Sequence, residues 1–450
     1  MHTSRLIPLV ALTLAAPALA QRQPPVTAAV SEARLRADLD TLVGLGTRHT
    51  MSEQDHATRG IGAARRWAEA EFRRIGAACG GCIAVELPER TVTGERVPTP
   101  TRLINVLGIQ RGNERPNEVV IISGHIDSRG TDVLDWRSNA PGANDDGSGT
   151  AAVIEAARVL SQRRYPTTIV YAVLSGEEQG LLGGRLLADW AKERGFTVKA
   201  VLNNDIIGGS RGSDGRVDAG SVRVFSEGPR ADATDASRAA GRREGGENDS
   251  PSRNLSRFVD TVAAHQRGLG LDVRQVWRSD RFGRGGDQLP MQDAGFPAVR
   301  LTVGIEDYDH QHQDVRTENG TFYGDVIAEM DFAYLARVTR LNIAALDALA
   351  RAPMPPAPRV RGAVSTDTTL EWPEVTGAAG YRVYQRATDA RDWMPVTRLP
   401  AAARGHVLRG VRVDDWVFGV ASVSAAGAES PVASAVPGGA FVPLPRPAAR

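Results

Sequence analysis

Apolar residues recur every three or four positions along residues 28–76 of the chain. Leu35, Leu39 and Leu42 follow this spacing, which puts them on one face of a helix. We therefore predict helical structure over this range. Further stretches share the spacing and are also predicted to be helical: residues 150–161, 181–192, 255–269 and 326–349.

Short continuous apolar runs alternate with these helices. Runs of this kind predict strands buried on both faces, and they occupy residues 168–174, 198–204 and 299–303. Two earlier runs, residues 102–110 and 118–123, are separated by a polar turn and predict a hairpin. The alternation of helix and strand predicts an α/β domain, with a largely parallel mixed sheet covered by helices on both faces.

The pattern changes after residue 207. Residues 208–254 are rich in Gly, Arg, Asp and Ser, which predicts a long loop or insertion. Residues 352–358 form a proline-rich linker of the semi-rigid type. Short alternating runs follow it and predict a small β-sandwich over residues 359–438, which resembles a fibronectin type III domain in its spacing. We expect residues 439–450 to be a flexible tail.

Residues 1–20 have the features of a secretory signal peptide. Arg5 supplies a positive charge, residues 6–16 are mostly apolar, and an A-x-A sequence at 18–20 precedes the cleavage position at Gln21. The alternative is a membrane anchor, but a bilayer requires ~20 apolar residues, and neither this run nor any other stretch reaches that length. We therefore expect a secreted or periplasmic protein without a membrane span.

Charge and cysteine content narrow the class further. The sequence has 54 Lys plus Arg against 53 Asp plus Glu, so its charge gives no reason to expect nucleic acid or an anionic membrane as a partner. Cys79 and Cys82 are its two cysteines. They could form a redox pair or half of a zinc site, but no second pair completes such a site. In an exported chain we expect a small structural disulfide.

Histidine and acidic residues follow the predicted strands at several places. His125 ends an apolar run, with Asp127 two residues later, where a carboxylate can orient a metal-bound imidazole. Asp145 and Asp146 lie in a glycine-rich segment that leads into a helix, and glycines let the backbone approach a metal closely. Taken singly, such residues are more often a loop histidine and a helix cap.

Further segments supply the remaining acids and histidines. Glu177 and Glu178 end an apolar strand, and Asp205 lies in an apolar run, where a buried carboxylate needs a partner. His310 and His312 come much later. In open α/β sheets, sites form beyond the carboxyl ends of strands, so these segments together predict a metal centre. Nitrogen and oxygen donors suit zinc, and two ions would be held if one carboxylate bridges them.

In this order, the segments resemble those of the di-zinc aminopeptidase family, which includes bacterial leucyl aminopeptidase and is related to glutamate carboxypeptidase and glutaminyl cyclase. The likeness covers residues 49–349 and implies a zinc exopeptidase fold for a peptidase domain at residues 21–351.

The resemblance also implies roles for single residues. One zinc would be bound by His125, Asp145 and Asp205. The second would be bound by Asp145, Glu178 and His312. Glu177 would be the general base, Asp127 the acid behind His125, and Asp145–Asp146 an unusual cis peptide.

Two departures from the family pattern bear on the site. The family usually has Tyr immediately before its last histidine ligand, whereas Tyr308 is two residues ahead of His310 and four ahead of His312. His312 is the preferred ligand and His310 the alternative, and the role of Tyr308 is left open. Where the family often has Asp-His, this chain has Asp287 and Gln288, which changes one wall of the pocket.

The resemblance implies an aminopeptidase that acts on peptides with a free amino terminus. Glu177 would take the proton of a water activated by two zinc ions and pass it to the leaving amine. The alternatives are a related amide hydrolase, such as a carboxypeptidase or dipeptidase, and a non-catalytic binding protein on the same fold. A glutaminyl cyclase is less favoured, because His125 completes a second zinc site. The C-terminal domain could bind a surface or a polymer, and the sequence does not specify which.

Overall fold

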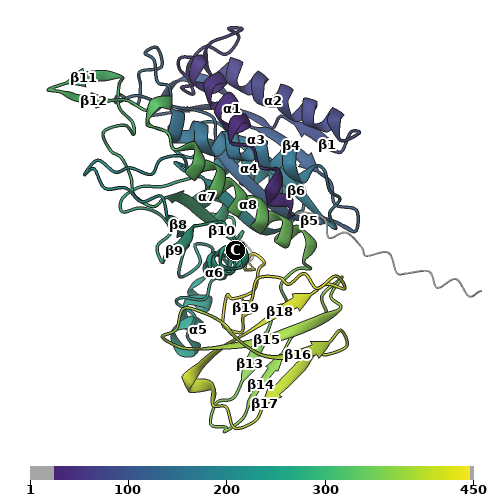
Figure 1. Cartoon of the computed structure of the whole chain (residues 1–450). Helices are drawn as coiled ribbons and strands as arrows, with labels where there is room; N and C mark the ends of the chain where they lie inside the picture. Colours follow the sequence, from purple (N-terminus) through teal and green to yellow (C-terminus); the bar gives the residue numbers. More distant parts are fainter. Residues whose placement is uncertain (1–24, 446–450) are drawn as a thin grey trace, which may run out of the picture.

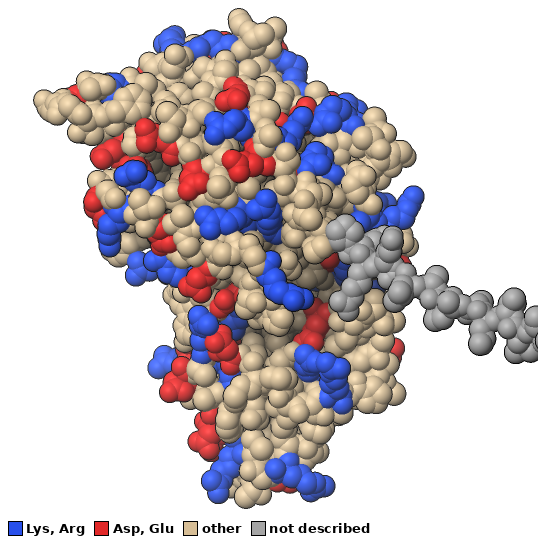
Figure 2. All heavy atoms as spheres, in the orientation of Figure 1, with Lys and Arg blue, Asp and Glu red and all other residues tan. Residues whose placement is uncertain are grey.

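The computed structural model describes residues 25–445. The predicted signal peptide at 1–20 and residues 446–450 of the predicted tail lie outside that range. Figure 1 shows a larger body of helices and strands with a smaller body of strands attached to it. Among residues 25–445, no helix is long and apolar enough to cross a membrane. On the face drawn in Figure 2, basic and acidic side chains are interspersed, in keeping with the balanced composition.

An eight-stranded sheet forms the centre of the larger body, in the order β1-β4-β6-β5-β7-β10-β8-β9. Its middle strands β6, β5, β7 and β10 run parallel, whereas β4 and β8 are antiparallel to the middle strands that they flank. The predicted mixed sheet with a parallel centre is thereby confirmed. The strands are β1 (Ile83–Glu86), β4 (Val106–Gln110), β5 (Arg115–His125), β6 (Thr167–Leu174), β7 (Thr197–Asn204), β8 (Ser221–Phe225), β9 (Asp272–Val276) and β10 (Ala298–Val303).

Helices cover both faces of this sheet (Figure 1). Helices α1, α2, α3, α6 and α8 pack on one face, and α4 and α7 pack on the other. Two hairpins lie outside the sheet, β2 (Glu89–Gly94) with β3 (Val97–Ile104) and β11 (Arg316–Glu318) with β12 (Thr321–Tyr323). The helices are α1 (Glu32–Gly44), α2 (Gly60–Ala78), α3 (Ser148–Leu160), α4 (Leu182–Glu193), α6 (Pro251–His265), α7 (Gln288–Asp293) and α8 (Phe332–Arg351).

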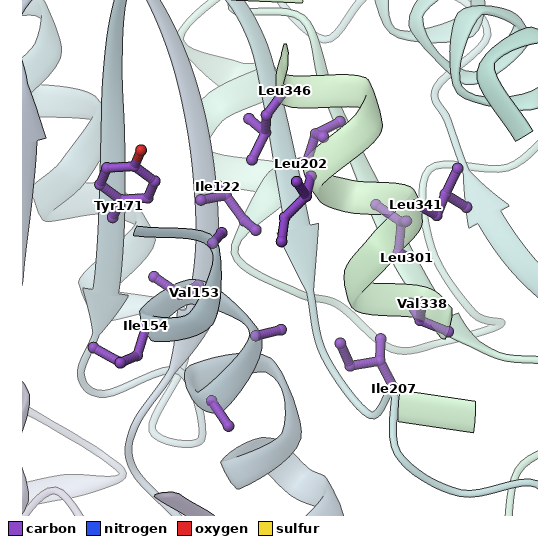
Figure 3. Close-up of a cluster of buried hydrophobic side chains, with 14 of the residues drawn as sticks. Ile122, Val153, Ile154, Tyr171, Leu202, Ile207, Leu301, Val338, Leu341 and Leu346 are labelled. Carbon is purple, nitrogen blue, oxygen red and sulfur yellow. The ribbon is translucent and has the colours of Figure 1, made fainter. Parts of the chain in front are cut away.

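Alternate residues of the central strands supply two separate cores. Ile122 on β5 belongs to the cluster under α3 and α8, together with Leu202 and Leu301 (Figure 3). Its neighbour Ile121 belongs to the cluster under α4 and α7. Successive side chains of a strand point to opposite faces, so a sheet covered on both faces requires continuous apolar runs. Each fully buried side chain of this size contributes roughly 1.5–3 kcal/mol, which holds the strand ends in place.

The predicted hairpin is wrong. Strand β6 lies between β4 and β5, pairing antiparallel with the first and parallel with the second. The polar turn shows where the chain leaves one strand, but it does not decide which strands pair. The crossover through α3 decides that, because this helix packs back onto the sheet and brings β6 beside β5.

Two other predicted ranges are interrupted. The helix expected over residues 28–76 is divided into α1 and α2, and the chain turns between them at Gly46 and Gly60, whose φ angles of 77° and 82° favour glycine. The loop expected over residues 208–254 contains strand β8 and helix α5 (Asp235–Glu244). Val222 on β8 is fully buried, and such apolar residues add this segment to the sheet.

The smaller body consists of two antiparallel sheets around one core. Leu370, Tyr381 and Phe418, from strands of both sheets, are buried in that core together with Trp372. The predicted β-sandwich is therefore present, and its likeness to a fibronectin type III domain stays a prediction. One sheet contains β13 (Arg359–Arg361), β14 (Thr368–Glu371) and β17 (Gly405–Leu408), and the other contains β16 (Met394–Pro400), β15 (Gly380–Ala387), β18 (Trp416–Val423) and β19 (Ala433–Ser434).

The two bodies meet in a packed interface. The prolines of the predicted linker, residues 352–358, are buried. Arg386 of the smaller body pairs with Asp249 of the larger one, with 2.5 Å between Nη2 and Oδ1, and both residues are buried. Trp393 donates from Nε1 to Oδ1 of Asn254 on α6 at 3.1 Å. The β-sandwich is thus fixed against α6 rather than held at a distance by a spacer.

Candidate metal centre

His125 is the last residue of β5, and its ring is held between aspartates. Nδ1 lies 3.1 Å from the backbone oxygen of Asp127 and 3.7 Å from its Oδ1. On the other side, Nε2 lies 3.1 Å from Oδ1 of Asp145 and 3.8 Å from Oδ1 of Asp205. The ring therefore presents Nε2 to two carboxylates while a third residue fixes it from behind, as is typical of histidines that bind metals.

Asp145 lies between His125 and a second histidine, His312. The side chains around these two histidines form the two halves of one cluster. Oδ1 of Asp145 lies beside His125, and its Oδ2 lies 2.9 Å from Nε2 of His312. The peptide bond from Asp145 to Asp146 is cis, as the resemblance implies. Asp146 accepts the backbone N–H of His125 at 3.0 Å on Oδ2 and that of Gly149 at 2.8 Å on Oδ1. It thereby ties the end of β5 to the start of α3 and leaves Asp145 to face the cluster.

Glu178 and His312 form the second half of the cluster. Oε1 of Glu178 lies 3.1 Å from Nε2 of His312. Oε2 accepts a hydrogen bond from Nε of Arg129 at 2.9 Å, and Nη2 of this arginine lies 2.6 Å from Nδ1 of His312. Sequence reasoning missed Arg129. Its position two residues after Asp127 is the signal that could have found it.

Asp127 connects the histidine to the turn that carries the two glutamates. It is fully buried, and its Oδ1 accepts the backbone N–H of Gly176 at 2.8 Å. Its Oδ2 accepts the backbone N–H of Glu178 at 3.1 Å. One carboxylate thus lies behind His125, as expected, and also fixes the backbone on either side of Glu177.

Glu177 has a free carboxylate. Among residues 25–445, its side chain takes part in no hydrogen bond or ion pair, although its backbone N–H is held by Oδ1 of Asp127 at 3.3 Å. Burial raises the pKa of Glu177 well above its usual range, and the carboxylates of Asp205 and Glu178 raise it further against the influence of His125. A free carboxylate with a raised pKa beside metal-binding groups is suited to accepting and returning a proton.

Asp205 is paired with an arginine that sequence reasoning missed. Oδ2 lies 2.8 Å from Nη1 of Arg300, which is fully buried. Burial opposes the ionisation of Asp205, but this guanidinium keeps the pKa of the aspartate below its usual range. Asp205 therefore stays ionised and offers Oδ1 to the cluster. An arginine inside the apolar run at 299–303 is a signal that could have identified it, because a buried charge needs a partner.

Asp325 supports the backbone in front of Asp145. Its Oδ1 accepts the N–H of Asn144 at 2.8 Å, and its Oδ2 accepts the N–H of Asp145 at 2.7 Å. No motif marks this aspartate in the sequence, because its partners are backbone amides of a distant segment.

The structure brings His312 and not His310 into the cluster. Nδ1 of His310 lies 2.7 Å from Oδ2 of Asp307, outside both groups of candidate ligands. Tyr308 is 60% exposed and belongs to neither group.

Two groups of side chains fit a pair of metal ions. His125, Asp145 and Asp205 form one group and Asp145, Glu178 and His312 the other, with ligand atoms within 4.8 Å of one another in each. Nε2 of His125 and Oε1 of Glu178 are buried without a hydrogen-bond partner among the described residues. An unsatisfied buried polar atom costs ~1–3 kcal/mol, and a cation between the donors removes that cost. The donors are nitrogen and oxygen, which suit zinc.

Comparison with known proteins decides the family. Residues 105–325 match the family described as Peptidase family M28. Probable zinc metalloprotease Lema_P086240 of Leptosphaeria maculans is 43% identical, over 91% of this chain and 95% of its own length. A probable zinc metalloprotease of Pyrenophora teres f. teres is 42% identical, over 89% of this chain and 84% of its own length. This chain belongs to peptidase family M28.

Solved structures of low identity share the fold of this M28 peptidase. The LapA aminopeptidase of Legionella pneumophila has a TM-score of 0.52 at 17% identity, covering 72% of this chain and 74% of that chain. An aminopeptidase from Aneurinibacillus sp. strain AM-1 has a TM-score of 0.50 at 14% identity, covering 72% of this chain and 95% of that chain. These likenesses confirm the predicted α/β fold.

A pocket of about 390 Å³ opens onto the candidate ligands of this M28 peptidase. Its lining includes Asp145, Glu178 and His312 of one group and Asp205 of the other. Glu177 lies in its wall. Residues of both groups of candidate ligands and the free carboxylate of Glu177 therefore border one pocket.

Proposed function

We propose that this M28 peptidase is a secreted aminopeptidase that uses two zinc ions to hydrolyse the first bond of a peptide. The observation that carries the proposal is the position of Asp145, whose two oxygens face His125 on one side and His312 on the other. Asp145 is therefore the residue that would serve both ions. The names of the relatives support zinc as the metal, and the structures of aminopeptidases support cleavage at the amino terminus.

In the proposed reaction, the candidate metal ligands, Glu177 and Asp127 have different roles. Zinc held by these ligands would polarise the scissile carbonyl and lower the pKa of the attacking water. Glu177 accepts the proton that the water releases and returns it to the departing amine. Asp127 holds the backbone of Glu177 at 3.3 Å, which keeps the free carboxylate in the wall of the pocket.

Export is part of the proposal. The signal features of residues 1–20 support it. The disulfide between Cys79 and Cys82, just after α2, supports it as well, because disulfides persist in oxidising compartments. Amino-terminal sequencing of protein recovered from outside the cytoplasm should begin at Gln21, and recovery of intact protein only from the cytoplasm would contradict export.

Metal content and turnover of amino acid anilides test the enzymatic part. We expect about two zinc ions per chain, cleavage of anilides with a free α-amine, and no cleavage of the N-acetylated forms. Removal of metal with a chelator should abolish cleavage, and added zinc should restore it. A single zinc per chain would remove the bridging role of Asp145. Equal cleavage of free and acetylated substrates would contradict an aminopeptidase.

A further inference from the structure

The pocket over the candidate ligands is charged rather than apolar, and four carboxylates of the candidate metal centre line it: Asp145, Glu177, Glu178 and Asp205. Four arginines line it, Arg96, Arg129, Arg281 and Arg284, whereas Leu181 is the one large apolar side chain among its lining residues. Pockets that receive apolar groups are lined predominantly by apolar and aromatic side chains. The composition of this wall therefore points to a charged group on the substrate.

The carboxylates close to this wall do not balance its arginines. Oε2 of Glu306 lies 2.7 Å from Nη1 of Arg284 and 3.6 Å from Nη1 of Arg281. Oε1 of the same glutamate lies 2.6 Å from Nη2 of Arg223. Three guanidinium groups thus share one carboxylate.

A second acid, Asp280, does not remove the excess of positive charge. Its Oδ1 lies 3.0 Å from Nε of Arg281, but its Oδ2 lies 3.5 Å from Nη1 of Arg300. Arg300 is already the partner of Asp205. With Asp205 included, three carboxylates therefore serve four guanidinium groups, which leaves one positive charge in excess beside the pocket.

Two arginines of the pocket have donors that form no hydrogen bond with a carboxylate among the described residues. The side chain of Arg281 is 8% exposed, and its Nη1 has no hydrogen-bond partner among the described residues. Arg96 forms no ion pair among residues 25–445, and its Nη1 donates to the backbone oxygen of Glu178 at 3.2 Å. Guanidinium groups match carboxylates, which they can bind through two parallel hydrogen bonds.

We propose that this wall, formed by Arg96, Arg281 and Arg284, is a subsite for a carboxylate of the substrate. The inference rests on the proposed peptidase function and names its substrates: peptides with a negative charge next to the bond that is cleaved. That charge comes from an acidic side chain at the amino terminus or from the terminal carboxylate of a short peptide.

Single arginine substitutions test the subsite. Arg284→Gln and Arg96→Gln each remove one charge and leave every candidate metal ligand in place. Arg278→Gln is the matched control, because Arg278 lies in the same loop as Arg284, is exposed, and does not line the pocket. Anilides of Glu, Gln and Leu test a side-chain carboxylate. The dipeptide Leu-Gly and its C-terminal amide test a terminal one.

The wild type should cleave the charged member of one substrate set faster than its neutral counterparts. Loss of one charge-assisted contact costs ~1.5–3 kcal/mol, so Arg284→Gln should lower kcat/KM for the charged substrate about ten- to a hundredfold, mainly through KM. The kcat/KM of Arg284→Gln for neutral substrates and its zinc content should differ from the wild type by less than about twofold. The kcat/KM of the Arg278→Gln control should also change by less than about twofold. Equal losses for charged and neutral substrates, or a preference of the wild type for neutral ones in both sets, would overturn the subsite.

A binding measurement separates failure of the subsite from failure of the peptidase function. Calorimetry with glutarate on zinc-loaded protein reports the carboxylate contact without turnover. We expect Arg284→Gln to weaken glutarate binding about tenfold or more while zinc content stays unchanged. If no peptide is cleaved but this loss is seen, the proposed function fails and the subsite stands. Equal glutarate affinity in wild type and variant would overturn the subsite even in an active enzyme.

Discussion

Arg300 and Asp205 are joined inside the sheet, with 2.8 Å between Nη1 of the fully buried arginine and Oδ2 of the aspartate. The arginine is on β10, and the aspartate directly follows β7, its parallel neighbour. Oδ1 of Asp205 lies 3.8 Å from Nε2 of His125. An arginine of the core therefore sets the charge of a candidate ligand, so the metal centre depends on a residue that would not touch the metal.

Arg300→Met should destabilise the metal-free protein by ~3–5 kcal/mol, because it leaves buried carboxylates without their counter-charge. The loss should be smaller in the zinc-loaded protein, where bound metal supplies positive charge to Asp205. Denaturant unfolding of both forms measures the difference. An equal loss in the two forms would count against Asp205 as a ligand.

Glu177→Gln should lower kcat by ~10²–10⁴-fold and change KM much less, because it removes a proton acceptor that acts in the transition state. Zinc content should stay at the wild-type value, since this carboxylate is in neither group of candidate ligands. Elemental analysis and steady-state kinetics on the same preparation give both quantities.

Glu178→Gln is the matched variant for that measurement, with the same chemical change one residue away. It should lose zinc and, for that reason, activity, because Oε1 of Glu178 is a candidate ligand atom in contact with His312. Loss of zinc from the Glu177 variant and retention in the Glu178 variant would exchange the two roles. Full activity of both variants would contradict the proposed mechanism.

Because of Glu227, the free energy of unfolding should fall as the pH rises towards neutrality. Burial raises the pKa of this glutamate from 4.5 to about 7, so the folded protein holds its proton at pH values where the unfolded chain has released it. The contribution of this proton to the free energy of unfolding is complete below pH ~4.5. It falls by ~1.4 kcal/mol for each pH unit between the unfolded-state pKa of 4.5 and the folded-state pKa of about 7. It is lost once the pH has passed through the folded-state pKa. Glu227→Gln should therefore gain stability over the wild type between pH 5 and 8, by up to ~3 kcal/mol. Denaturant unfolding of both proteins across this pH range measures the gain, and a difference that does not vary with pH would contradict the raised pKa.

Arg386→Ala should destabilise the protein by ~3 kcal/mol, because Asp249 stays buried and loses its closest counter-charge, at 2.5 Å, with only Arg257 left at 3.8 Å. The double variant Asp249→Asn with Arg386→Met should recover much of that loss. Arg398→Ala, at an exposed position of β16, is the control and should change stability by less than ~0.5 kcal/mol. Denaturant unfolding of all variants tests whether the two bodies stabilise each other, and an unchanged Arg386→Ala protein would show that they do not.

The parts of the fold that could be predicted correctly are those that depend on the local pattern of apolar and polar residues. Continuous apolar runs predict β6, β7 and β10 correctly, since a strand buried on both faces has few polar positions. The hairpin of β4 and β5 was wrong because pairing depends on where α3 returns the chain, which no run of residues encodes. Within residues 208–254, β8 was missed because its short apolar run is surrounded by polar sequence.

The same distinction holds within the site. His125, Glu177 and Glu178 could be found because each stands where an apolar run ends. Asp325 could not, because its partner Asp145 lies 180 residues away along the chain. Arg129 follows Asp127 closely, but its contact with His312, 183 residues away, is not visible in the sequence. Only the folded chain brings such pairs together.

The contacts of α6 with the β-sandwich also bear on the order in which the molecule is completed during synthesis. Asp249 and Arg386 are 137 residues apart, and Asn254 and Trp393 are 139 residues apart. His312 leaves the ribosome well before Arg386 and Trp393, so every candidate metal ligand is available while the outer side of α6 is still uncovered. Domains generally form as units from the amino terminus, and surfaces exposed at intermediate stages are prone to association. In a nascent chain, the outer side of α6 therefore stays exposed until the β-sandwich has been made.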